Sequence, residues 1–180
     1  AGCGSYSKIE GFGFIPVTCF SQALTTFIGQ NLGAKEYDRA KKGALFGTVC
    51  GIGIAEVIGI AVFFFSPYLI AAFGGDQKAI EYGIAEAHTI ALFYCLLAFS
   101  HCMAAIQRGA GRSIVPMFVM MIVWCGVRVT YISIVIRIIP VINVIYWAYP
   151  LTWFISSVIF LILFLKTDWI HGLEKQGQGA

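Results

Sequence analysis

Five long, nearly uncharged apolar segments, separated by short loops, constrain this chain more than any other feature. Each segment is as long as, or longer than, the ~20 residues that an α-helix needs to cross a hydrocarbon core about 30 Å thick. Inside a bilayer there is no water to bind backbone polar groups, so a spanning segment must satisfy its hydrogen bonds internally. The sequence therefore predicts an all-α, polytopic membrane helical bundle with transmembrane helices at about 11–32, 44–73, 87–107, 114–138 and 141–165.

The composition agrees with a membrane protein. Hydrophobic residues make up 59% of the chain and charged residues 12%, whereas soluble globular domains carry about 25% charged residues. Phosphate-binding loops and the hydrolase signatures GxSxG and HExxH do not occur in the sequence. The pattern favours neither an enzyme nor a nucleic-acid partner, and it makes the lipid bilayer the expected surroundings of the chain.

The distribution of lysine and arginine predicts the orientation, because short cytoplasmic loops carry an excess of these residues. Eight of them follow the first, third and fifth segments: Lys35, Arg39, Lys41, Lys42, Arg108, Arg112, Lys166 and Lys175. The loops on the other side hold Lys8, Lys78 and Arg137. The tail at 166–180 is thus expected in the cytoplasm and the N-terminus outside. A chain that begins outside without an initiator Met is interpreted as a fragment, with residues 1–7 ending a loop after a helix that the sequence lacks.

Small residues recur every four positions in the second segment, which places them on one helix face. They are Gly43, Gly47, Gly51, Ala55 and Gly59. Such a face lets another backbone approach closely, which is how membrane helices associate. Packing within the bundle is the expected role, and homodimerisation through this face is the alternative.

Six cysteines are scattered at positions 3, 19, 50, 95, 102 and 125 without CxxC spacing, so we interpret them as small apolar residues. His101 and Cys102, close to Cys95, could form one corner of a metal site, but a tetrahedral site needs further ligands that the sequence does not place. We therefore predict no metal site.

Polar side chains line one face of the first segment, where Thr18, Gln22 and Thr25 recur at helical spacing. Such a face should turn away from lipid. It predicts either hydrogen bonds to neighbouring helices or the wall of a hydrated substrate cavity. Pro16 removes a backbone donor near the outer end of this helix and could kink it there.

Glu56 and Arg128 are two charges deep inside predicted spans. Counted from the cytoplasmic ends of their helices, they lie at depths of about 20 and 22 Å at 1.5 Å per residue. A charge left unpaired at such depth costs roughly 2.5 to 3.5 kcal/mol on the insertion scale. We therefore expect either a buried ion pair between them or a hydrogen-bonded buried carboxyl, with a proton-relay or substrate-binding role for Glu56 as the alternative.

Aromatic residues cluster toward the outer end of the last segment at Tyr146, Trp147, Tyr149 and Trp153. Trp and Tyr anchor membrane helices at the interface with water, so this cluster is typical of an aromatic belt. The alternative is an aromatic cavity wall in which Tyr149 and Trp153 contact an organic cation.

With helices and loops in place, the sequence resembles the MATE family of multidrug and toxic compound extrusion transporters. The stretch KIEGFGFIPVTCFSQALTTFIGQNLGAKEYDRAKKG, at 8–43, is similar to a family helix that ends in GQNxGA before a charged loop with RAKKG. The stretch QRGAGR at 107–112 is similar to the family's RGxG loop. GVRV at 126–129 and AYPLTW at 148–153 resemble the last two helices of bacterial members.

The resemblance implies a twelve-helix protein of two six-helix lobes with both termini in the cytoplasm, in the cell inner membrane or plasma membrane. It implies expulsion of small organic cations by alternating access, driven by sodium or proton flow, with no cofactor beyond the coupling ion. This chain would supply helices eight to twelve, most of the second lobe, and would need the missing first lobe and preceding helix as partners. The predicted helix at 87–107 holds no carboxylate where sodium-coupled members place one, so a sodium site of that type is not expected.

Two other functions remain open on these residues. Lipid-linked oligosaccharide flippases share the wider superfamily fold that the resemblance implies. A membrane-embedded enzyme would need catalytic side chains gathered at one depth, and the sequence offers only the distant His88 and His101.

Overall fold

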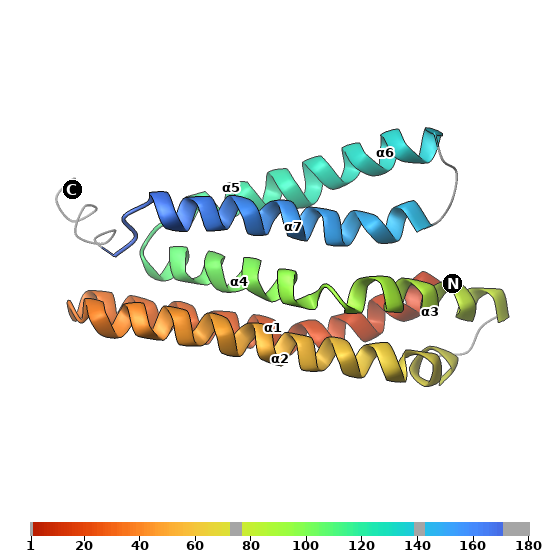
Figure 1. Ribbon diagram of the computed structural model, residues 1–180, viewed down its shortest axis with the longest axis horizontal. Helices are drawn as coiled ribbons and strands as arrows, with labels where there is room; N and C mark the ends of the chain where they lie inside the picture. Colours follow the sequence, from red (N-terminus) through yellow and green to blue (C-terminus); the bar gives the residue numbers. More distant parts are fainter. Residues whose placement is uncertain (1, 73–76, 139–142, 171–180) are drawn as a thin grey trace.

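The computed structural model describes residues 2–72, 77–138 and 143–170, and this part of the chain is helical with no β-strand (Figure 1). The elements are α1 (Gly2–Gly33), α2 (Tyr37–Ala72), α3 (Gln77–Ala91), α4 (Tyr94–Gly109), α5 (Ile114–Met120), the π-helix η1 (Met121–Val127), α6 (Arg128–Ile138) and α7 (Asn143–Lys166). Four helical stretches are long and apolar enough to cross a membrane, and α3 with α4 makes a fifth if that bent pair is one span. The predicted all-α membrane bundle is confirmed.

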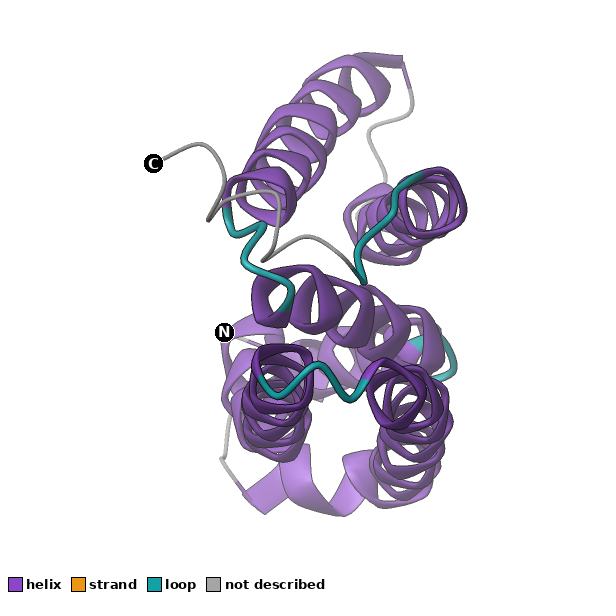
Figure 2. Ribbon diagram, turned by 90° about the vertical axis from the view of Figure 1, so that its left-hand side faces the viewer, coloured by secondary structure: helices purple, strands orange, loops and turns teal. Residues whose placement is uncertain are grey.

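The helices form three levels (Figures 1 and 2). The long helices α1 and α2 run side by side in one level, and α4 packs on both of them. The third level contains α7, which contacts α4, and the run from α5 through α6, which contacts α7. The helix α4 is thus the central element of the described bundle.

The small-residue face of α2 packs inside the bundle. A Cβ atom added to Gly47 would lie 2.7 Å from Leu24 Cδ1 of α1, and one added to Gly51 would lie 2.7 Å from Cys102 Sγ of α4. Side chains at these positions would push the helices apart. The face therefore serves contacts within the chain, as expected.

The third predicted helix differs most from its sequence-based bounds. It starts at Gln77, ten residues before the predicted start, and bends by 54° at Leu92 and Phe93, where α3 ends and α4 begins. The charges near 78–86 lower the local hydropathy, which placed the predicted start too late. As a result Glu86, one residue before the predicted start, lies within the helix α3.

The helix α1 also begins earlier than predicted. Residues 2–7, expected to end a loop, belong to the helix, because Tyr6 and Ile9 are buried in the core and hold this turn against the bundle. The charged side chains of Lys8 and Glu10 interrupt the hydropathy pattern without interrupting the helix. In the same way α2 begins at Tyr37, within the stretch expected to be a basic loop.

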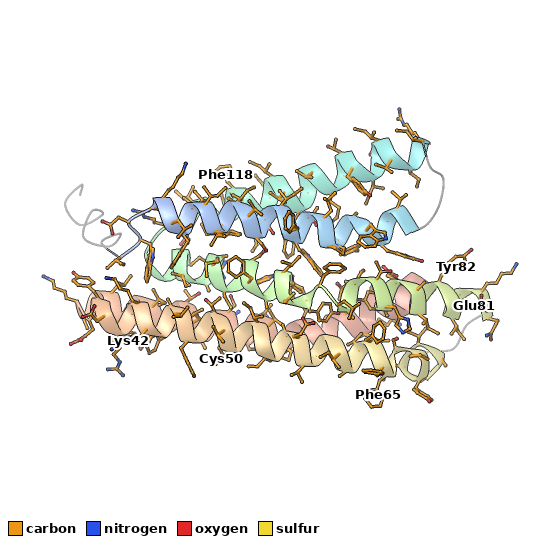
Figure 3. The ribbon with its side chains drawn as sticks, viewed as in Figure 1. Lys42, Cys50, Phe65, Glu81, Tyr82 and Phe118 are labelled. Atoms are coloured by element: carbon orange, nitrogen blue, oxygen red, sulfur yellow. The ribbon has the colours of Figure 1, made fainter. Side chains whose placement is uncertain are left out.

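The fourth predicted helix has the expected ends but not the expected regularity. Between α5 and α6 the backbone forms the π-helix η1 over seven residues, a form that is rare and often found at functional sites. Apolar side chains cover the outside of the bundle, where Phe65 and Phe118 are exposed (Figure 3). That surface suits hydrocarbon, in keeping with a membrane-spanning chain.

Candidate functional site

A pocket of about 250 Å³ lies between α1, η1, the start of α6 and α7. Charged and aromatic side chains meet there, from three stretches of the chain that are distant in sequence. Its lining residues are Ser7, Glu10, Gly11, Phe14, Trp124, Arg128, Tyr149 and Trp153. A concave site with an aromatic wall and a few polar groups is the usual form of a small-molecule site.

Arg128 is held against α7 on the wall of this pocket. Its Nη2 donates a hydrogen bond to Thr152 Oγ1 at 2.8 Å. Its guanidinium carbon lies 4.2 Å from the centroid of the Tyr149 ring and 5.7 Å from that of Trp124, which is cation–π geometry. The π-helix brings Trp124 and Arg128 to the pocket together, since they lie near its centre and just after its end.

One carboxylate, Glu10, acts on this cation, and a second, Glu86, lies near the first. Glu10 interacts electrostatically with both Glu86 and Arg128. Glu86, on α3, is only 4% exposed. One turn before Glu10, the buried Tyr6 forms a hydroxyl–hydroxyl hydrogen bond with Tyr94 at 3.2 Å, and Tyr6 interacts electrostatically with both carboxylates. The site therefore combines an acidic pair, two phenols and one guanidinium.

Several buried donors of the pocket wall have no hydrogen-bond partner among the described residues. They are Nε1 of Trp124, Nε1 of Trp153 and Nε of Arg128. Buried donors are normally paired, and leaving one unsatisfied costs roughly 1–3 kcal/mol. Acceptor atoms of a bound molecule would remove that cost, so the wall suits a ligand that carries acceptors.

Three of the predicted site residues come together in this pocket, namely Tyr149, Trp153 and Arg128. The other cavity candidates lie elsewhere along α1. Thr25 donates to the Ala105 carbonyl of α4 at 3.3 Å, Thr18 donates to the Ile15 carbonyl of its own helix at 2.8 Å, and Gln22 is exposed. For Thr25 the contacts match the alternative of hydrogen bonds between helices.

Glu56 and Arg128 do not form an ion pair, which was one of the two structural arrangements expected for these charges. The thiol of Cys95 lies within hydrogen-bonding reach of Glu56, and Glu56 Oε2 has no hydrogen-bond partner in the described chain. Arg128 instead lies with Thr152, Tyr149 and Glu10. Equal depth placed the two charges at one level, but α4 lies between α2 and the α6–α7 level.

The sequence reasoning missed Glu10, Glu86 and Trp124. The two carboxylates fell just outside the predicted spans, because each span was ended at the nearest charge. A helical wheel of α1 extended by two turns would have found Glu10 one turn after Tyr6. Trp124 gave no signal, since nothing in the sequence predicts the π-helix that directs it.

Metal ligands do not gather in the part of the chain that the structure describes: no group of three or more His, Cys, Asp or Glu side chains could hold an ion. The His101 ring packs on Phe14 and Trp124, with centroids 5.2 and 5.6 Å apart. Cys102 is buried against the small-residue face of α2. Both residues therefore contribute packing at the positions considered for a metal corner.

Comparison with known proteins identifies the family. Residues 1–132 match the family model described as MatE. The chain belongs to the MATE family. It is 28% identical over 118 residues to the probable multidrug resistance protein NorM of Thermotoga maritima, a match that covers 65% of this chain and 25% of that protein. The chain thus matches about a quarter of the length of this curated relative.

The fold is shared with a solved structure described as the inward-facing conformation of a multidrug resistance MATE family transporter of the MOP superfamily. The TM-score is 0.78 at 16% identity, over 94% of this chain and 39% of the solved one. Members of the MATE family are multi-pass membrane transporters and not enzymes.

Proposed function

We propose that this MATE chain forms most of the second six-helix lobe of a secondary multidrug efflux transporter, in which organic cations leave the cell in exchange for sodium ions or protons. The observation that carries the proposal is the pair of carboxylates, Glu10 and Glu86, beside an aromatic pocket. Intramembrane carboxylates are costly and commonly mark ion and substrate pathways.

Coupling follows from the charges of this site. With both carboxylates ionised and one guanidinium present, the group of Glu10, Glu86 and Arg128 carries one net negative charge. Repulsion between the two carboxylates is relieved when a proton or a sodium ion binds. A cationic substrate relieves the same repulsion, so ion and substrate compete for one site. Such competition couples inward ion flow to outward substrate flow when the lobes alternate their access.

The side chains of the pocket wall also indicate which substrates the pocket prefers. Tyr149, Trp124 and Trp153 offer aromatic faces for a flat ring or a cation, and Glu10 offers a negative charge. The unsatisfied donors of Arg128 and the two indoles suit acceptor atoms at the far side of the same molecule. We therefore expect aromatic amines that also carry acceptor groups to be better substrates than purely hydrocarbon cations.

The flippase alternative rests on the same donors, because phosphate oxygens are strong acceptors for arginine. A lipid-linked oligosaccharide substrate would depend on Arg128 and would not need the acidic pair. Substitution of Arg128 and of Glu86 therefore distinguishes the two functions.

The test uses the full-length protein, expressed in cells that lack their own efflux pumps, with ethidium accumulation as the readout. We expect Glu86→Gln to lower the rate of ethidium efflux by about tenfold or more. This corresponds to a rise of at least about 1.4 kcal/mol in the activation free energy of transport. The matched control is Glu81→Gln, because Glu81 is exposed on the same helix (Figure 3). This control should keep the wild-type rate.

Proteoliposomes with either a sodium or a proton gradient then identify the coupling ion. Equal efflux rates for Glu86→Gln and Glu81→Gln, at matched expression, would refute the coupling role of the acidic pair. Full ethidium efflux in Glu86→Gln, together with loss of lipid-linked oligosaccharide translocation in Arg128→Gln, would favour the flippase.

A further inference from the structure

A second groove, of about 480 Å³, opens on the outside of the bundle at the end where α1 turns into α2. Its floor is α4, its two walls are α2 and α7, and it is closed by the residues that follow α7. The lining residues are Lys41, Ala44, Leu45, Thr48, Phe99, Met103, Ile106, Leu161, Phe164, Trp169 and Ile170. All but Lys41 and Thr48 are apolar or aromatic.

The groove is elongated along the helix axes. On α2 its lining runs from Lys41 to Thr48, and on α4 from Phe99 to Ile106. Seven residues of α-helix rise about 10 Å. Helices that cross a bilayer stand roughly along its normal, so the long axis of the groove is parallel to the acyl chains of the surrounding lipid.

A single cation stands at one end of the apolar lining. Lys41 lies near the start of α2, and within the described residues its ammonium has no ion-pair partner. The segment 35–42 around it holds four basic and two acidic residues, a net charge of about +2 at neutral pH. Figure 3 shows Lys42 at the same end of the bundle. An apolar channel with a cation at the level of the basic loop is complementary to a lipid with an anionic headgroup.

A fixed aromatic ring lies at the same end of the groove as Lys41, because α7 ends where α2 begins (Figure 1). The Trp169 ring stacks on Phe164 with centroids 5.4 Å apart and is 5% exposed. Arg112 donates from Nη2 to the Asp168 carbonyl at 3.0 Å, which ties the residues after α7 to the end of α4. The groove is therefore part of the folded chain and is shaped before any ligand enters.

We propose that this groove binds one acyl chain of an anionic phospholipid whose phosphate pairs with Lys41. The lipid stands against α2, α4 and α7. The residues that line this groove and those that line the pocket between α1, η1 and α7 have no member in common. The proposal is thus independent of which substrate or ion the transporter moves.

The test is a lipid titration of the delipidated full-length protein, followed by native mass spectrometry of the first bound lipid. Phosphatidylglycerol and phosphatidylcholine with the same acyl chains are the two probes. We expect phosphatidylglycerol to bind about fivefold more tightly, the effect of one lysine near an anionic headgroup. Lys41→Gln should abolish this preference. Lys42→Gln, which removes the same charge one residue outside the lining, should retain it.

A second variant tests the apolar part. Leu161 is 44% exposed, so Leu161→Trp can fold while it narrows the groove, and it should reduce the first binding step of both lipids. Phosphatidylglycerol with brominated acyl chains should quench the fluorescence of Trp169, and Trp169→Phe should remove that part of the quenching.

Equal affinity of the wild type for the two lipids would overturn the proposal. So would equal effects of Lys41→Gln and Lys42→Gln, because the headgroup would then respond to general charge. No effect of Leu161→Trp would also overturn it, since another protein segment would then fill the groove.

Discussion

Replacing Gly59 with alanine tests the contact between α2 and the break of the α3–α4 span. A Cβ atom at this position would overlap the backbone carbonyl of Ala91, the last residue of α3, and would lie 3.4 Å from the Tyr94 Cβ. A flexible side chain could turn away, but a backbone carbonyl can move only if the bend between α3 and α4 changes. Overpacking of this kind costs about 1–3 kcal/mol.

Gly53 of the same helix supplies the matched control, because nothing lies within 4 Å of a Cβ atom added there. Both substitutions gain roughly 0.5–1 kcal/mol from the better helix propensity of alanine. The difference between them therefore isolates the clash, and we expect Gly59→Ala to be about 1–3 kcal/mol less stable than Gly53→Ala.

Equilibrium unfolding of the full-length protein in mixed detergent micelles, followed by circular dichroism, measures this difference. Equal unfolding free energies for the two alanine variants would refute the close packing of α2 on the helix break. Cysteine labelling at position 92 provides an independent readout, since a shifted bend should change the accessibility of that residue only in Gly59→Ala.

Three further predictions use other contacts. Ser100→Ala should destabilise the protein by about 1–3 kcal/mol in the same unfolding assay, because the Ser100 hydroxyl links α4 to two serine hydroxyls of α7 at 2.9 Å. An unchanged free energy of unfolding would show that this link does not stabilise the bundle. The effects of Glu56→Gln and Arg128→Gln on the free energy of unfolding should be additive within about 0.5 kcal/mol, since the two residues share no partner. A larger coupling energy would show that they do form an ion pair. In a cysteine-free background, an impermeant thiol reagent should label Gln77→Cys from outside and Glu36→Cys only after permeabilisation; the reverse pattern would invert the orientation.

The sequence specified the spans better than their ends. Five apolar segments predicted the helices because lipid exposure demands long apolar runs, and the family motifs in the resemblance led to the correct family. Glu10 and Glu86 were placed outside the spans for the same reason, since a hydropathy pattern stops at a charge even when the helix continues and buries it. The partner of Arg128 was mispredicted because depth along a helix is readable from sequence, whereas the direction it faces in the bundle is not.

The π-helical turn of η1 contains the equivalent of one extra residue, because its hydrogen bonds run from i to i+5 and not from i to i+4. One residue turns an α-helix by about 100°, so each side chain beyond η1 is rotated about the axis relative to an unbroken helix. Arg128 is the first of them. Deleting Ile122, which is 58% exposed, would keep the arginine in the chain and turn it out of the pocket. The charge of the pocket is thus set by residue count as well as by residue identity, and a one-residue gap here in an aligned relative would mark a pocket without this cation.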